Sequence, residues 1–220
     1  MVQAASVTAE TIAPSAQSEQ RLTLHNISWD TYEKILVALG EHRAAHLTYD
    51  EGVLEFMVPL EAHENSSDVI GAFIRALVVE SGQNLKSMAS TTLRRRALQK
   101  GAEPDKCFYI QNEAQVRGRQ VDLEQDPPPD LVVEVDITHT DIDKNALYAK
   151  LGVPEFWRFN GRTLTLYQLQ VGQYTEVEVS PTFPWANEDV FYTYLKRCRS
   201  SGEAEALRQL AVWVASHRPQ

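Results

Sequence analysis

Hydrophobic and polar positions follow two different periods along the chain, and these periods predict helices and strands in turn. Apolar residues recur at helical spacing from Asp30 to Leu39, and again, in pairs four residues apart, from Ser66 to Glu80. Between these two predicted helices, His46 to Pro59 carries two strand-like runs on either side of a turn signal, Asp50-Glu51-Gly52. The first half of the chain is therefore expected to fold as helix, β-hairpin and helix.

The second half of the chain is richer in strand patterns. We expect a short helix from Asp143 to Leu151 and one or two helices between Pro184 and Trp213. The polar stretch Asn112–Pro129, which ends in consecutive prolines, is expected to be a loop. Strands are predicted at Ser90–Arg96, Lys106–Gln111, Leu131–Ile137, Glu155–Phe159, Thr163–Leu169 and Gln173–Val179. This order predicts an α/β domain in which a mixed sheet has helices on its faces.

Composition narrows the class of protein. The chain has 220 residues and is 43% hydrophobic, enough for one folded domain, expected over residues 21–220 with a helical C-terminal segment. Residues 1–20 are small and polar, and we expect a disordered tail there. No apolar run approaches the roughly 18 residues that cross a membrane, and a net charge of -9 argues against a protein that coats nucleic acid. Because Cys107 and Cys198 are far apart in the sequence, a reducing cytoplasm is the expected compartment.

The carboxylates of the Leu131–Ile137 strand are the most informative polar residues. Side chains alternate along a strand, so Glu134 and Asp136 share one face, about 7 Å apart. Because the strand is otherwise apolar, we expect it to be central in the sheet. Burying two carboxylates is costly unless a cation neutralises them, and oxygen ligands suit Mg²⁺ or Mn²⁺. Asp105 begins the preceding predicted strand, and Lys144 shares a helix face with Tyr148.

Each of these residues also has an ordinary structural interpretation. Acidic residues at strand ends often cap loops or pair with arginine, and a lysine four residues before a tyrosine commonly lies on a solvated helix face. The combination of Asp105, of Glu134 with Asp136, and of Lys144 on the next helix favours a metal site over those separate explanations.

Three stretches of the sequence carry a resemblance to a known family. They are YDEGVLEFMVPLEAHE from Tyr49, TTLRRRALQKGAEPDKCFYI from Thr91, and PPDLVVEVDITHTDIDKNALYAKLGVPEFWRF from Pro128. With them the chain resembles a large bacterial family of restriction-endonuclease-like proteins within the PD-(D/E)XK nuclease superfamily. The resemblance implies a restriction-endonuclease-like core, with a central mixed β-sheet flanked by α-helices, and a magnesium-dependent phosphodiesterase site.

The resemblance also implies roles for single residues. Asp105 matches the first acid, Glu134 the second acid and Lys144 the lysine, while His63 matches a histidine at the start of the first core helix. In the simplest superfamily pattern a lysine stands two residues after the second acid, where this chain has Asp136. Either Lys144 replaces that lysine from the helix, or cleavage is impaired.

These observations lead to a metal-dependent DNA endonuclease, with catalytic residues Asp105, Glu134, Lys144 and His63. Asp105, Glu134 and Asp136 would bind Mg²⁺ or Mn²⁺, and Arg94, Arg96 and Lys100 would contact DNA, although a charged edge strand explains that basic run equally well. Two alternatives remain at this point: a nucleic-acid-binding protein that cleaves slowly or not at all, and an interaction protein that forms a homodimer through Phe156 and Trp157.

Overall fold

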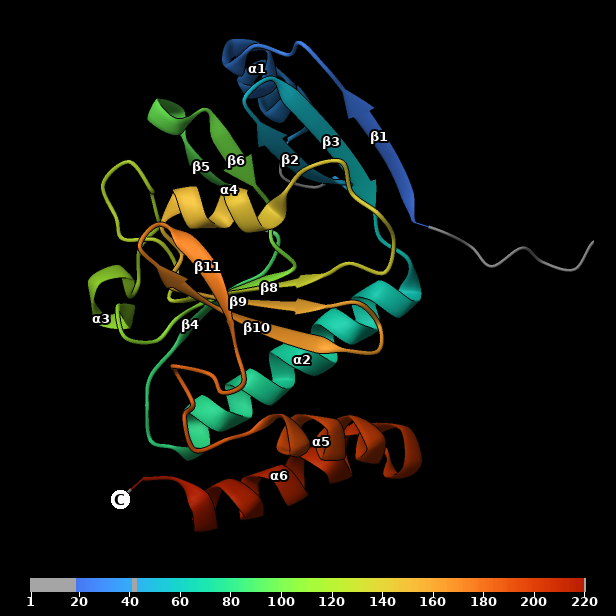
Figure 1. The fold of residues 1–220 in the computed structure, drawn as a ribbon, viewed down its shortest axis with the longest axis vertical. Helices are drawn as coiled ribbons and strands as arrows, with labels where there is room; N and C mark the ends of the chain where they lie inside the picture. Colours follow the sequence, from blue (N-terminus) through green and yellow to red (C-terminus); the bar gives the residue numbers. More distant parts are fainter. Residues whose placement is uncertain (1–18, 41–42, 220) are drawn as a thin grey trace, which may run out of the picture.

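Two β-sheets lie above one another with a short helix between them, and three longer helices cover the outer face of the larger sheet (Figure 1). The computed structural model describes residues 19–40 and 43–219. Most of the predicted tail, residues 1–18, lies outside these described residues. The predicted tail boundary at residue 20 is wrong, because Glu19 is buried and Gln20 already begins the first strand.

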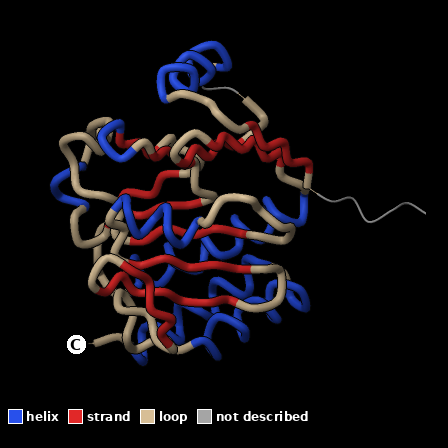
Figure 2. Tube along the Cα trace, turned by 45° about the horizontal axis from the view of Figure 1, so that its top comes forward, coloured by secondary structure: helices blue, strands red, loops and turns tan. Residues whose placement is uncertain are grey.

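The smaller sheet has the strand order β1-β3-β2-β6-β5, and the larger has the order β11-β10-β9-β8-β7-β4. Figure 2 shows the two sheets as separate tiers. All neighbouring strands are antiparallel except β8 and β9, which makes the larger sheet mixed. The strands are β1 (Gln20–Leu24), β2 (His46–Asp50), β3 (Val53–Val58), β4 (Lys86–Met88), β5 (Leu93–Arg95), β6 (Lys100–Ala102), β7 (Lys106–Tyr109), β8 (Leu131–Val135), β9 (Glu155–Phe159), β10 (Leu164–Gln170) and β11 (Gln173–Val177).

The helices form the layers around these sheets. Apolar residues of α1 pack on the smaller sheet, α4 lies between the sheets, and α2, α5 and α6 cover the far face of the larger sheet. The helices are α1 (Trp29–Leu39), α2 (Glu61–Glu80), α3 (Glu113–Val116), α4 (Lys144–Leu151), α5 (Glu188–Ser201) and α6 (Glu203–His217), with a 3-10 turn, η1, at Arg96–Leu98. No helix among the described residues is both long enough and apolar enough to cross a membrane.

The mixed α/β architecture predicted from the sequence is confirmed, with local corrections. There are two sheets instead of one, because the hairpin β2–β3 pairs with β1 and β6 and does not join the larger sheet. The second helix begins at Glu61 instead of Ser66, and α3 interrupts the expected loop. The polar stretch around Ser90–Arg96 contributes only the three residues of β5.

β8 is the strand that positions the site. All five of its residues are buried, and its faces alternate as predicted. Leu131, Val133 and Val135 belong to the core beneath, formed with α2, α5 and α6. Val132 belongs to the core between the two sheets, where α4 packs. Glu134 is therefore carried on the face of the larger sheet that α4 covers.

Candidate functional site

Three neighbouring strands of the larger sheet bring polar residues to the face below α4. β7 and β8 pair Cys107 with Val132, so Asp105, two residues before Cys107, continues along the face that carries Glu134. β8 and β9 run parallel and pair Glu134 with Arg158. Asp143 caps α4 by accepting a hydrogen bond from the Ala146 amide, which places Lys144 at the first turn of the helix, above Glu134.

Lys144 connects the carboxylate of Glu134, which is part of β8, with the carboxylate of Asp136, which follows the strand. Its Nζ lies 2.5 Å from Glu134 Oε2 and 2.9 Å from Asp136 Oδ1. The remaining oxygens also have donors, since Tyr148 Oη donates to Glu134 Oε1 at 2.5 Å and Arg158 Nε donates to Asp136 Oδ2 at 2.7 Å. We call these five residues the Lys144 cluster. Each carboxylate oxygen in it accepts a hydrogen bond from a buried or half-buried donor.

Burial and charge shift the pKa values of this cluster in opposite directions. Burial, reinforced by the nearby charges of Asp105 and Asp136, raises the pKa of Glu134 to about 7 against the opposing effect of Lys144. For Lys144 burial works against the charged form, but the carboxylates of Glu134, Asp136 and Asp105 outweigh it and raise the pKa. Lys144 therefore stays protonated, whereas Glu134 can exchange a proton near neutral pH.

Asp105 lies beside this cluster and is surrounded by different groups. The amide of Val135 donates to Asp105 Oδ2 at 2.6 Å, which ties Asp105 to β8 directly after Glu134. Two imidazoles approach the carboxylate from the smaller sheet and from α2. His46 Nδ1 lies 3.4 Å from Asp105 Oδ1, and His63 Nε2 lies 3.3 Å from Asp105 Oδ2.

Glu19 completes this second group, with Oε1 at 3.9 Å from His63 Nε2. We call Glu19, His46, His63 and Asp105 the Asp105 cluster. Nine buried side-chain nitrogen or oxygen atoms among the described residues have no hydrogen-bond partner, and five of them lie in these four residues: Glu19 Oε1, His46 Nδ1, both ring nitrogens of His63 and Asp105 Oδ1. Buried polar atoms are normally paired, so this concentration sets the cluster apart from the rest of the molecule.

The charges of the Asp105 cluster stabilise one another even without aligned hydrogen bonds. Burial opposes ionisation of Asp105, but contacts with His46 and His63 and the charge of Lys144 lower its pKa. Burial likewise opposes protonation of His63, yet Asp105, Glu19 and Glu134 raise its pKa. The positive end of a helix disfavours a charged histidine, and the carboxylates act on His63 in the opposite direction at the start of α2.

Several site residues were not anticipated from the sequence. Arg21 on β1 bonds Glu19 at 2.9 Å and Glu55 at 2.7 Å, and its Nε donates to Thr138 at 3.1 Å. Glu55 on β3 also accepts from Thr140 at 3.0 Å. These contacts fasten the loop between β8 and α4 to the smaller sheet. Glu55 is buried, and its position inside the otherwise apolar run VLEFMV is the sequence signal that could have identified it.

The structure places the predicted metal ligand Asp136 and the predicted interface residues in paired or buried positions, and the metal role of Asp136 stays a prediction. Both oxygens of Asp136 are already engaged by Lys144 and Arg158, so in this arrangement it serves as their counter-ion. Phe156 and Trp157 are buried on opposite faces of β9, in the two cores of the larger sheet. Their rings are thus inaccessible to a second copy of the chain.

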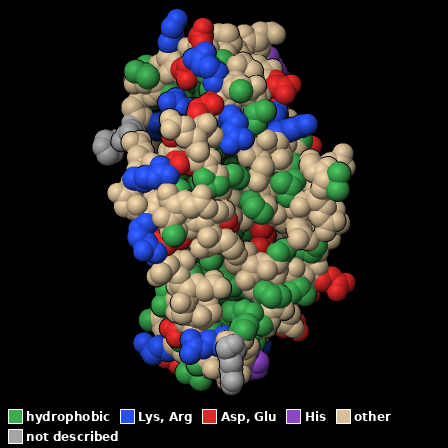
Figure 3. All heavy atoms as spheres, turned by 90° about the vertical axis from the view of Figure 1, so that its left-hand side faces the viewer, with side chains coloured by type: hydrophobic (Ala, Val, Ile, Leu, Met, Phe, Trp, Pro, Cys, Tyr) green, Lys and Arg blue, Asp and Glu red, His purple; other side chains and the backbone are tan. Residues whose placement is uncertain are grey.

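The predicted DNA contacts do not form one basic surface. Lys100 is buried and paired with Asp50 and Glu51, so its charge is already neutralised within the protein. Arg96 is exposed but bonds Asp30 and Glu33, and Arg94 lies 3.9 Å from Glu33. Acidic and basic side chains are interspersed on the face seen in Figure 3. This arrangement matches the alternative interpretation of a charged edge.

The donor chemistry of the site fits a hard divalent cation. Among residues 19–40 and 43–219, no three His, Cys, Asp or Glu side chains are placed to share one ion. Mg²⁺, however, commonly uses one or two carboxylates and completes its shell with water and substrate phosphate. Asp105 has an unpaired, buried Oδ1, and its charge helps to raise the pKa of the nearby Glu134. Asp105 and Glu134 therefore suit a two-carboxylate magnesium site.

The fold and this grouping of acids with a lysine define a class: the chain has a restriction-endonuclease-like α/β architecture. The model of the Uma2 family, described as "Putative restriction endonuclease", matches residues 29–194, and the chain belongs to that family. The match contains Asp105, Glu134 and Lys144 but ends before α6 and begins after β1. A search of curated proteins found no match to the chain. Family membership indicates a nuclease-like protein.

Proposed function

We propose that the protein is a metal-dependent endonuclease that hydrolyses DNA phosphodiester bonds. The observation that carries this proposal is the convergence on one buried face of Asp105, which directly precedes β7, Glu134 of β8 and Lys144 of α4. The family resemblance implies all three residues, and strand pairing and the capped start of α4 bring them together.

The residues have distinct tasks in this proposal. Asp105 and Glu134 supply carboxylate oxygens for a divalent ion, which would activate water and stabilise negative charge on the phosphate. Lys144 keeps its proton because of the surrounding carboxylates, and its ammonium orients Glu134 through a direct contact. His63 balances the charge of Asp105 and holds that side chain from the α2 side.

Lys144 takes the place of the strand lysine that the simplest superfamily pattern has at position 136. Its Nζ lies against both Glu134 and Asp136, so a lysine on α4 reaches the same carboxylates. The same contacts favour a second candidate function. Because Lys144 and Tyr148 occupy both oxygens of Glu134, a protein that binds DNA but cleaves it slowly is the alternative.

Cleavage of supercoiled plasmid by the purified protein, with Mg²⁺, Mn²⁺ or chelator, tests the proposal. We expect metal-dependent nicking that is lost in the double variant Asp105→Ala, Glu134→Ala. Glu176→Ala removes an exposed carboxylate on β11 and is the matched control, expected to cleave like wild type. Binding of duplex without any metal-dependent cleavage would instead support the alternative function. Equal cleavage by the double variant and wild type would place the activity elsewhere.

A further inference from the structure

We propose that Arg158 contacts the phosphate backbone of the substrate and that Asp136 is the positioning residue that holds its guanidinium at the site. This inference rests on the proposed function and adds a substrate contact to it. Asp136 was expected to bind metal, and Arg158 was not among the expected site residues.

The strand register places Arg158 on the same face of the larger sheet as Glu134. Arg158 is the partner of Glu134 across the parallel strands β8 and β9, and residues paired in this way point to the same side. Its Nε donates to Asp136 Oδ2 at 2.7 Å, and its Nη1 donates to Asn145 Oδ1 at 3.0 Å. Two groups from different elements thereby fix the plane of the guanidinium.

The fixed guanidinium retains donor capacity. A guanidinium has five N–H donors, and within the described parts of the chain no acceptor is paired with Arg158 Nη2. The planar fork matches the oxygens of a phosphate group in two parallel hydrogen bonds. A guanidinium that is oriented before binding loses less conformational freedom when the phosphate arrives.

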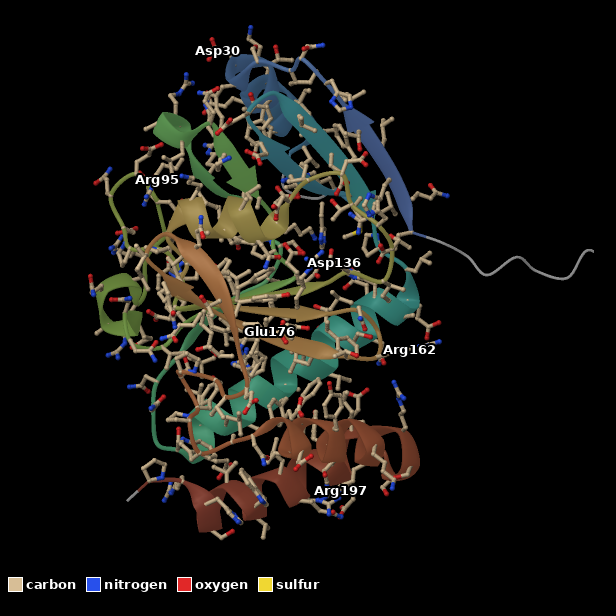
Figure 4. The ribbon with its side chains drawn as sticks, viewed as in Figure 1. Asp30, Arg95, Asp136, Arg162, Glu176 and Arg197 are labelled. Carbon is tan, nitrogen blue, oxygen red and sulfur yellow. The ribbon has the colours of Figure 1, made fainter. Side chains whose placement is uncertain are left out.

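Accessibility separates Arg158 from the other cation of the cluster. The Lys144 side chain is 4% exposed and its ammonium lies between two carboxylates, whereas the Arg158 side chain is 34% exposed. A phosphate can therefore approach Arg158 without displacing the protein's own ion pairs. Asp136 is labelled in Figure 4 above the larger sheet. Its Oδ1 accepts a hydrogen bond from Lys144 and its Oδ2 accepts one from Arg158, so each oxygen holds one cation.

Asp136 also explains why a positive group is stable at this position. Burial disfavours the charge of the Arg158 guanidinium, and the contact with Asp136 more than compensates by raising its pKa. For Asp136, burial is opposed by Lys144 and Arg158, which lower its pKa. Each partner therefore favours the charged form of the other.

The salt dependence of DNA binding tests the assignment. The affinity of labelled duplex is measured by fluorescence anisotropy in Ca²⁺, over a range of KCl concentrations, for wild type, Arg158→Gln and Arg158→Lys. Loss of one phosphate contact should lower the slope of log affinity against log salt by about 1. Arg158→Lys keeps the charge and should retain the slope. Single-turnover cleavage in Mg²⁺ should fall about tenfold or more in Arg158→Gln, the scale of one lost hydrogen bond to a charged group.

A matched control removes the same charge elsewhere. Arg197→Gln changes an arginine of α5, on the far side of α2 and of the larger sheet from Asp136 (Figure 4), and should keep the wild-type slope and rate. If Arg158→Gln folds poorly because Asp136 loses its partner, the double variant Asp136→Asn, Arg158→Gln removes both charges together. The reduced slope is expected in that variant as well.

The outcomes separate the two proposals. A wild-type slope in a folded Arg158→Gln protein, or in the double variant, overturns the role of Arg158. Metal-dependent cleavage by the wild-type protein would still support the nuclease function in that case. A wild-type protein that neither binds nor cleaves duplex removes the proposed function and this assignment with it.

Discussion

The Lys144 cluster and the Asp105 cluster lie side by side, yet they differ in how their polar atoms are paired. In the first, each oxygen of Glu134 and Asp136 accepts from Lys144, Tyr148 or Arg158. In the second, His63 lacks a hydrogen bond at either ring nitrogen, and Glu19, His46 and Asp105 each have one unpaired atom. The chain thus builds a saturated half and an unsaturated half around one pair of carboxylates.

The difference separates the Lys144 cluster, whose polar atoms are paired within the protein, from the Asp105 cluster, whose unpaired atoms can still bind a ligand. A saturated ion-pair network is costly to break, because removing one partner leaves a buried charge without compensation. Unpaired buried atoms have already lost their hydration, so a ligand or a small rearrangement that satisfies them gains free energy. We therefore expect substitutions in the Lys144 cluster to affect folding and cleavage together, and substitutions in the Asp105 cluster to affect metal binding first.

The largest effect is expected for Lys144→Ala. Single-turnover cleavage should fall on the order of a hundredfold, the scale of one lost electrostatic group. The free energy of unfolding, measured by urea denaturation, should also fall by about 3 kcal/mol, because Glu134 and Asp136 lose their shared cation. This is the lower end of the usual range, since Glu134 can take up a proton in response.

Lys150→Ala is the matched control, because Lys150 lies exposed in the last turn of the same helix. It should leave both cleavage and unfolding unchanged. Wild-type cleavage by Lys144→Ala would mean that the lysine has a purely structural role. Cleavage lost without any change in unfolding would contradict the saturated character of this cluster.

A smaller effect on folding is expected for Asp105→Asn. The amide keeps an oxygen for the Val135 amide and removes a charge whose second oxygen is unpaired. In chelator, the thermal midpoint should therefore fall less than that of Lys144→Ala. Mn²⁺, which stabilises a native state that binds it, should raise the midpoint of wild type but not of Asp105→Asn. An unchanged Mn²⁺ shift in this variant would exclude Asp105 as a ligand.

The smallest effect is a gradual dependence of stability on pH. Burial raises the pKa of Glu134 to about 7, and the neighbouring carboxylates raise that of His63 against burial. Between the ordinary pKa of a carboxyl and about 7, the native protein retains the Glu134 proton that the unfolded chain releases. The free energy of unfolding therefore falls as pH rises through this range. His63 contributes with the same sign, because its native protonated form is lost as pH rises through its raised pKa.

Urea denaturation in chelator, at pH values on both sides of the pKa of about 7 for Glu134, measures this dependence. Glu134→Gln removes one titrating group, so its unfolding free energy should decline less steeply with pH than that of wild type. Parallel pH profiles for the two proteins would show that Glu134 is already ionised throughout the range.

The sequence predicted the parts of the site that depend on local patterns. Alternation along β8 correctly separated Glu134 from the apolar face, and the spacing of α4 placed Lys144 beside Tyr148. Glu19, Arg21 and His46 were missed, because they reach the site through pairing between distant strands. No periodicity marks such contacts. Which catalytic, metal and DNA roles the predicted residues have stays a prediction.

Helix boundaries show a second limit of local patterns. Asn65 and Ser66 are good capping residues, yet α2 begins at Glu61, and Ser66 Oγ donates to the Ala62 carbonyl at 2.7 Å within the helix. Glu61 and Glu64 stabilise this first turn through their interaction with the helix dipole. The earlier start brings His63 into the helix and under Asp105, where a later start would have left it in a loop.

The contacts of β1 and α6 have a consequence for how the protein can be divided. Arg21 of β1 is the guanidinium partner of buried Glu55, and Ala206, Leu210 and Val214 of α6 fill the core below the larger sheet. Both elements lie outside the family match at residues 29–194. A fragment trimmed to residues 29–194 would expose apolar surface where α6 is missing. It would also leave the buried carboxylate of Glu55 without its guanidinium partner. The segment that matches the family is therefore shorter than the segment that the folded structure needs.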